Sequence, residues 1–276
     1  MLQKNNGEYK GLPLPSKGDA KTFYKRLSSY ISLFDETWKS RIQPIQKNKL
    51  QEFENYFALD NYMFKLPDTY YSFLLTMGGN DGGLITDTID GYSEISLDVL
   101  MKIYDKSMAP YIPFVEVPIS GYALFFNLNS NCEIVEIFRP ERVYGHTRET
   151  FEQLIFRCAF KKFFLQEGYE KLKKIYPQYT SKRLQIELES YETDSNLENN
   201  VYGIIIKNCQ EKFAVSEEWF SNQDGLITDC YVGTTSERDT VITVDNRGSY
   251  LYIVIAGYNP ELIDELMEFM KQFCVE

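Results

Sequence analysis

Carboxylates are the side chains whose type and spacing in this chain most suggest chemistry. Five of them lie close together in the sequence, at Asp81, Asp87, Asp90, Glu94 and Asp98. Closely spaced carboxylates bind Ca²⁺ or act as an acid and base pair. The spacing of an EF-hand is absent, so turn formation and helix capping account for these residues more simply than a metal site does. A surface that binds another protein is the intermediate interpretation.

A glycine-rich loop, Gly78-Gly79-Asn80-Asp81-Gly82-Gly83, comes shortly before most of these carboxylates. Backbone N–H groups of such loops can bind phosphate. Phosphate loops of this kind follow a strand, whereas this one follows a predicted helix, and no Gly-Lys-Ser/Thr sequence comes after it. The loop is therefore predicted to end a helix and turn the chain, without a ligand.

Histidine and cysteine restrict the remaining chemistry. His146 is the single histidine, so catalysis or metal binding by two histidines is excluded, and we expect a polar loop residue there. The five cysteines are scattered and form no CxxC pair, which indicates reduced thiols in a cytoplasm. No Gly-x-Ser-x-Gly, Ser-x-x-Lys or His-Glu-x-x-His motif occurs. We therefore expect no catalytic residue, no metal and no cofactor.

The charge balance limits the class of partner. The 276 residues include 29 Lys and Arg against 40 Asp and Glu, a formal charge of −11. Phosphate binding needs clustered basic residues, so this balance argues against nucleic acid and favours a basic partner. The N-terminus lacks an apolar signal segment, and no apolar run reaches the roughly 18 residues of a membrane span. We expect a soluble, cytoplasmic protein.

The helices and strands that the sequence predicts, and that must position these residues, indicate an α+β protein with two units. Residues 1–18 are expected to form a flexible or loosely docked arm, residues 19–169 a first domain that begins with a helix, and residues 170–276 a second, smaller α+β unit. In the second unit, residues 201–206 are apolar and predict a strand, and Asn259 caps a final helix.

The first domain has the clearest helix signals. Thr150, with Gln153 three residues later, forms a capping box at the start of a long Phe-rich helix. An earlier helix is expected between Pro67, which suits a first helical turn, and Gly78, which suits a C-terminal cap with positive φ. Its apolar face should be buried.

This earlier helix carries a resemblance to a known family. The motif Leu66-Pro67-x-x-Tyr70-x-x-Phe73-Leu74-x-x-x-Gly78-Gly79 resembles the signature helix of the SUKH superfamily, which ends at a glycine pair. The resemblance covers roughly residues 42–166 and implies an α+β fold with a sheet packed against helices. It also implies that the apolar motif residues pack the core rather than bind a partner.

Many SUKH proteins of bacteria are immunity proteins, which bind and neutralise toxins, often nucleases. The resemblance therefore implies a non-catalytic immunity protein, and the acidic charge agrees because it can attract a basic toxin. Residues 66–138 hold ten acidic residues and two basic ones. The partner surface expected there consists of Asp81, Asp87, Asp90, Tyr92 and Glu94. Two alternatives stay open: a SUKH-type regulatory scaffold that binds another cellular protein, and an enzyme with its site in the C-terminal unit.

Overall fold

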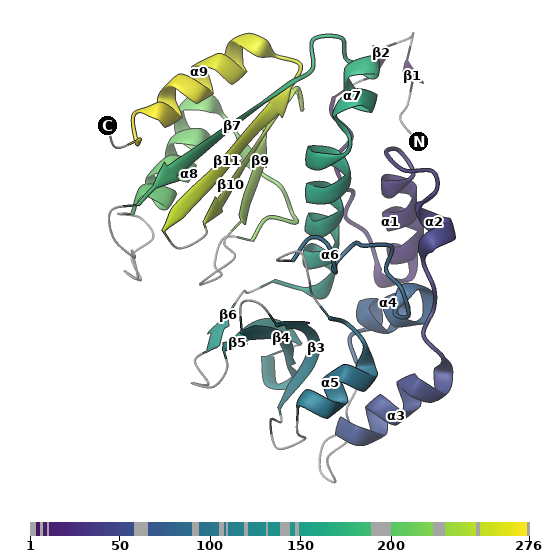
Figure 1. Cartoon of the computed structure of the whole chain (residues 1–276). Coiled ribbons are helices and arrows are strands. Elements are labelled where there is room, and N and C mark those ends of the chain that lie inside the picture. Colours follow the sequence, from purple (N-terminus) through teal and green to yellow (C-terminus); the bar gives the residue numbers. More distant parts are fainter. Residues whose placement is uncertain are drawn as a thin grey trace. The chain divides into compact units, whose positions relative to one another are not determined.

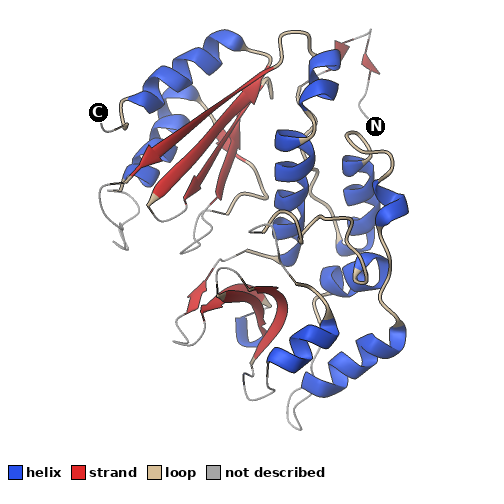
Figure 2. Ribbon diagram, in the orientation of Figure 1, coloured by secondary structure: helices blue, strands red, loops and turns tan. Residues whose placement is uncertain are grey.

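The structure is a computed structural model of the whole chain, and it shows an α+β protein (Figures 1 and 2). It describes residues 4–5, 8–9, 11–57, 66–89, 94–104, 108, 110–118, 121–130, 132–138, 144–146, 149–188, 200–222, 230–246 and 249–274. Within these ranges, no helix combines the length and the apolar character that crossing a bilayer requires.

The chain divides into two compact units, which are described separately. Unit 2 is the continuous segment Pro15–Phe163, and unit 1 combines Met1–Leu14 with Phe164–Glu276. The division, between Phe163 and Phe164, falls six residues before the predicted boundary at 169/170. It lies inside a continuous helical segment. That segment is α6 (Phe151–Ala159) followed without a break by the π-helical η4 (Phe160–Gln166).

Among its described residues, unit 2 contains more helix than strand, including the 3-10 turn η3 (Leu128–Ser130). Its other helices are η1 (Ala20–Thr22), α1 (Phe23–Ile31), α2 (Trp38–Arg41), α3 (Lys47–Phe57), α4 (Asp68–Met77), α5 (Leu97–Ile103) and α6. Asp19 caps the first of them through its side chain, which accepts the N–H of Thr22. The predicted capping box of α6 is confirmed, since Thr150 and Gln153 exchange side-chain-to-backbone hydrogen bonds.

The sheet of unit 2 is an antiparallel meander. Its order is β3 (Tyr111–Val117), β4 (Tyr122–Asn127), β5 (Glu133–Phe138) and β6 (Tyr144–His146). The register of β3 on β4 shifts between Pro113 and Val115, where the proline has no N–H for the ladder. Of His146 the structure describes the backbone, which belongs to β6, so the predicted loop position is wrong there.

The core of unit 2 is an aromatic cluster between α4, α6 and the sheet. It consists of Tyr70, Phe73, Phe114, Phe126 and Phe151, each at most 2% exposed. Tyr70 contacts Phe126 at 5.0 Å between ring centroids, and Phe73 contacts Phe151 at 5.3 Å. Large aromatic side chains bury about 150–250 Å² each and prefer such tilted contacts. The predicted burial of the apolar face of α4 is thus confirmed.

Unit 1 contains a second, five-stranded antiparallel sheet in the order β7-β11-β10-β9-β8. Its elements after η4 are α7 (Tyr169–Ile175), β7 (Thr180–Glu187), α8 (Val201–Phe213), β8 (Ser216–Glu217), β9 (Cys230–Thr234), β10 (Thr240–Asn246), β11 (Tyr250–Gly257) and α9 (Pro260–Lys271). One face of the sheet packs against α8 and α9, with Ile205 and Leu266 fully buried between the layers. Asn259 caps α9 as predicted.

The predicted strand at 201–206 is wrong, because this segment begins α8. A short apolar run does not by itself distinguish a buried strand from a buried helix. The deciding features are the cap, in which Asn200 accepts the N–H of Gly203 at 2.7 Å, and the continued helical spacing. Tyr202, Ile205 and Cys209 lie on one face and are buried in the core of unit 1.

The predicted flexible arm is wrong over Gly11–Leu14, which is buried in unit 1. Leu12 is 3% exposed, and its N–H donates to the carbonyl of Arg238 at 2.6 Å. The hydroxyl of Tyr176 donates to the carbonyl of Gly11. Gly11 has a φ of +81°, and a Cβ there would lie 2.8 Å from that of Arg238, so both the backbone angle and the space require glycine.

Candidate functional site

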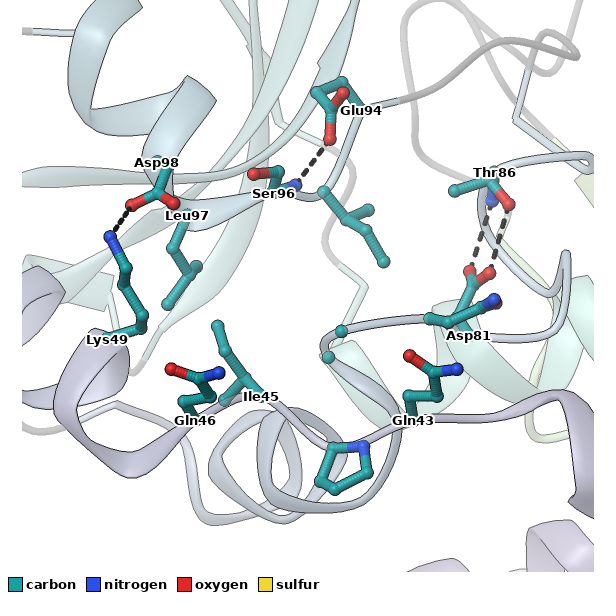
Figure 3. A pocket seen from close by; sticks show the side chains of 15 residues that line it. Gln43, Ile45, Gln46, Lys49, Asp81, Thr86, Glu94, Ser96, Leu97 and Asp98 are labelled. Atoms are coloured by element: carbon teal, nitrogen blue, oxygen red, sulfur yellow. Dashed lines mark hydrogen bonds and ion pairs between the residues drawn. The ribbon is translucent and has the colours of Figure 1, made fainter.

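The candidate site is a polar pocket of about 540 Å³ in unit 2. Three segments form it: the chain that leads into α3, the glycine loop after α4, and the segment that leads into α5. Figure 3 shows the amides of Gln43 and Gln46 on one wall and Glu94 and Ser96 on another. Its polar side chains include Gln43, Gln46, Lys49, Asp81, Glu94 and Asp98.

The glycine pair lets two walls of the pocket approach closely. Gln43 and Asn80 form an isolated antiparallel bridge, in which the N–H of Gln43 donates to the carbonyl of Asn80 at 2.8 Å. The N–H of Gly79 donates to the carbonyl of Gln43, also at 2.8 Å. A Cβ on Gly79 would lie 2.8 Å from the carbonyl oxygen of Pro44. This backbone atom cannot move away cheaply, so the close approach requires glycine.

Gly78 differs from the prediction of a positive φ. Its φ is −69°, in the right-handed helical region, and its N–H donates to the carbonyl of Leu74 at 3.1 Å. Its role is again close approach, because a Cβ would lie 2.8 Å from Cδ2 of Leu74. The positive φ angles of the loop occur later, at Gly82 (+66°) and Gly83 (+79°). The chain therefore turns four residues beyond the point that the helix motif predicted.

Asp81 organises this turn and is buried, with 1% of its surface exposed. Its Oδ1 accepts the N–H of Gly83 at 2.8 Å and the hydroxyl of Thr86 at 3.0 Å. Its Oδ2 accepts the N–H of Ile85 at 2.6 Å and that of Thr86 at 3.2 Å. These four bonds compensate the charge inside the protein. Asp81 is therefore a structural residue, which corrects its place in the predicted partner surface.

Glu94 and Asp98 supply the accessible negative charge of the pocket. Oε1 of Glu94 accepts the N–H of Ser96 at 2.7 Å, and the backbone of Glu94 pairs with that of Glu116 in β3. Oδ1 of Asp98 lies 2.7 Å from Nζ of Lys49 (Figure 3). The hydrogen bond that Lys49 donates to Asp98 is the main cause that raises the pKa of Lys49 above its usual value, so Lys49 stays charged.

Asp87, another residue of the predicted surface, lies apart from these. Asp87 does not line the pocket; its side chain is 62% exposed and forms an ion pair at 2.6 Å with Lys162, which is 11% exposed. Asp90 and Tyr92 lie outside the described residues. The pocket thus brings together Asp81 and Glu94 from the predicted set and adds Asp98.

The sequence did not reveal the opposite wall, formed by Gln43, Gln46 and Lys49. They come 29 to 35 positions before Gly78 and form no motif with the glycine loop. Tertiary contacts bring them near, among them the bridge at Gln43 and the hydrogen bond from the N–H of Ile45 to the carbonyl of Leu74 at 2.9 Å. The alternation of amide and basic side chains just before a helix is too common in loops to identify a site.

The pocket presents hydrogen-bond acceptors that suit a cationic group. Carboxylates and amide carbonyls accept hydrogen bonds from a guanidinium or ammonium group. In the part of the chain that the structure describes, no three His, Cys, Asp or Glu side chains come together as they would around a metal ion. Comparisons of the chain with protein families, curated proteins and solved structures gave no match.

Proposed function

We propose that this chain is a SUKH-type immunity protein, which neutralises a bacterial toxin by binding it and has no catalytic activity of its own. Two features support the family assignment. The apolar residues of the motif are buried, since Leu66 before α4 and Tyr70, Phe73 and Leu74 within it are 1–2% exposed. The glycine pair that ends the motif forms a wall of the pocket, through close backbone approach.

The observation that carries the proposal is the charge of this pocket. The charged side chains that line it, among the residues the structure describes, are three carboxylates and one ammonium group, that of Lys49, which is already paired with Asp98. The walls therefore attract cations. An arginine of a partner finds the carboxylates of Glu94 and Asp98 on one side and the amide carbonyls of Gln43 and Gln46 on the other. A basic toxin, such as a nuclease, offers this side chain.

The proposed inhibition has two causes: the immunity protein covers the basic face of the toxin, and opposite charges attract the two proteins to each other. A toxin that acts on nucleic acid needs a basic face for the phosphates of its substrate. An acidic protein that binds this face excludes the substrate and inhibits at one-to-one stoichiometry. Long-range attraction also accelerates the association of the two proteins, and salt weakens this acceleration because the Debye length falls to about 8 Å at 0.15 M.

The test begins with capture of the partner from the native cells on the tagged full chain and its identification by mass spectrometry. The captured protein is then purified, and its activity is titrated with the immunity candidate. We expect a toxin whose activity falls linearly to zero at one equivalent. A partner without toxic activity, or a toxin that stays active when saturated, would overturn the proposal; the former would favour a regulatory scaffold instead.

The pocket is tested with charge variants of matched size. Glu94→Lys should reduce the association rate and flatten its dependence on salt, because it reverses a charge at the mouth of the pocket. Glu261→Lys is the control, since Glu261 is exposed in α9 of the other unit and the change in net charge is the same. Equal effects of the two variants would show that the pocket is not part of the binding surface. The immunity role would still be tested by the titration of toxin activity.

A further inference from the structure

The sheet of unit 1 ends on a long strand with an open edge. β7 pairs with β11 alone and forms one edge of the sheet (Figure 1). The pairing runs without a bulge from Thr180 opposite Gly257 to Glu187 opposite Tyr250. β7 also contains no proline. Proteins often protect such an edge with a bulge, a proline, a very short strand or charged side chains. Within the described residues β7 has none of the first three, and its charged residues Arg183 and Glu187 have opposite signs, so they do not exclude pairing with a strand of matching charge.

The alternation of backbone hydrogen bonds along β7 shows which of its residues direct their N–H and C=O groups towards the open edge. The N–H of Leu188 donates to the carbonyl of Ser249 at 2.8 Å, in register with the ladder. Because this phase alternates along an antiparallel strand, the even-numbered residues of β7 bond to β11. Arg183, Gln185 and Glu187 therefore direct their N–H and C=O groups away from the sheet. All three are exposed.

We propose that β7 pairs antiparallel with β7 of a second copy of this chain, about a twofold axis at Gln185. In this register Gln185 lies opposite itself, and Arg183 of each copy lies opposite Glu187 of the other. Both positions are hydrogen-bonded pairs, as the outward phase requires. A shift of the partner strand by two residues places Arg183 opposite Gln185 or Gln185 opposite Glu187. Among the residues of β7 itself, Thr180–Glu187, only the register centred on Gln185 gives two ion pairs between opposite strands.

The two faces of the extended sheet agree with this pairing. Tyr252 lies beside Gln185 on β11 and is 41% exposed, so the dimer forms a row of Tyr252, Gln185, Gln185 and Tyr252 across four strands. On the other face, Leu184 lies opposite Ile186 of the second copy. Both residues already pack against the core under α8 and α9, so the apolar layer continues across the twofold axis. The occupant is thus a second copy, because the strand is complementary to itself.

The first test measures the mass of the full chain by sedimentation velocity across the micromolar range. We expect a reversible dimer. Gln185→Pro should give a monomer, because proline removes an outward N–H and leaves the ladder to β11 intact. Circular dichroism checks that this variant folds. If it does not fold, the charge variants described next decide whether β7 mediates dimerisation. A wild-type chain that stays monomeric throughout would overturn the proposal, even if β7 binds another protein.

Charge variants test the register. Arg183→Glu and Glu187→Arg should each raise the dissociation constant about tenfold, since each turns two attractive cross-strand pairs into repulsive ones. The double variant restores both pairs with reversed polarity and should return to within about threefold of the wild type. Lys207→Glu is the control, because this exposed residue of α8 gives the same change in charge away from β7. Failure of the double variant to restore dimerisation would overturn the register.

Cross-linking gives an independent readout. Opposed residues of a hydrogen-bonded pair have Cα atoms about 5.5 Å apart, within the range of about 4.4–6.8 Å that a disulfide spans. Gln185→Cys should therefore form a symmetric disulfide dimer under mild oxidation, in a background in which the half-buried Cys132 and Cys274 are serine. Leu184→Cys reports the register shifted by two. A cross-link at Leu184 without one at Gln185 would contradict the proposed axis.

Discussion

The buried carboxylate of Asp81 makes a sharp prediction about stability. Asp81→Asn keeps the shape of the side chain but replaces one oxygen by an amide that donates. Each oxygen accepts two hydrogen bonds: Oδ1 from Gly83 and the hydroxyl of Thr86, Oδ2 from Ile85 and the backbone of Thr86. An amide nitrogen at the Oδ2 position would face the backbone N–H groups of Ile85 and Thr86, so two bonds would be lost. At the Oδ1 position it would face the N–H of Gly83, so that bond would be lost, whereas the hydroxyl of Thr86 can rotate and accept from the amide.

The magnitude follows from these bonds. A hydrogen bond to a charged group contributes about 1.5–3 kcal/mol, so losing at least one of them and leaving a buried backbone N–H without an acceptor lowers the free energy of unfolding of unit 2 by about 3 kcal/mol. Asp98→Asn is the matched control. Its carboxylate is 47% exposed and its partner Lys49 is 36% exposed, so solvent screens this surface pair and its loss should change the free energy of unfolding little.

Tryptophan fluorescence provides the assay, because the chain has two tryptophans and each unit contains one. Trp38 is fully buried, and its Nε1 donates to the carbonyl of Asp81 at 3.2 Å. In a Trp219→Phe background, urea unfolding followed by fluorescence reports unit 2 alone. Equal midpoints for Asp81→Asn and Asp98→Asn would refute the structural role of Asp81 and return it to the partner surface.

Three further predictions concern the cores. Phe73→Ala should lower the free energy of unfolding of unit 2 by about 3–5 kcal/mol in the same assay, whereas a loss below about 1 kcal/mol would contradict its burial. Glu149 and Arg157 form a buried bidentate pair at 2.8 and 2.9 Å, so Glu149→Ala should cost about 3–5 kcal/mol and adding Arg157→Met should recover part of this, measured as a double-mutant cycle. Burial raises the pKa of Cys158 and of Cys209 to about 12, so native alkylation at mildly alkaline pH should be slow at both, as read by mass spectrometry. Because the thiols of the unfolded chain ionise near pH 9 and these two stay protonated in the folded chain, the free energy of unfolding should fall as pH rises from about 9 towards 12; unchanged stability there would contradict the shifts.

Local sequence rules identified much of the first domain. The apolar spacing of α4 predicts its buried face because a helix of 3.6 residues per turn brings Tyr70, Phe73 and Met77 to one side. The capping box at Thr150 and the cap at Asn259 were also predictable, since these hydrogen bonds lie within four residues. The same rules were wrong at 201–206, where the apolar run fits a strand or a helix equally well.

The candidate site depended on tertiary structure. The sequence indicated an acidic region and a glycine pair, but not that Gln43 pairs with Asn80 and so forms the opposite wall of the pocket. The sequence also grouped Asp81 with the exposed carboxylates. Charge and turn propensity can be read from a sequence, whereas the hydrogen-bond donors that surround a folded side chain cannot. Composition and periodicity are local properties and determine the charge, the fold class and many helices. The role of an individual carboxylate depends on burial and on neighbours, and only the folded chain decides both.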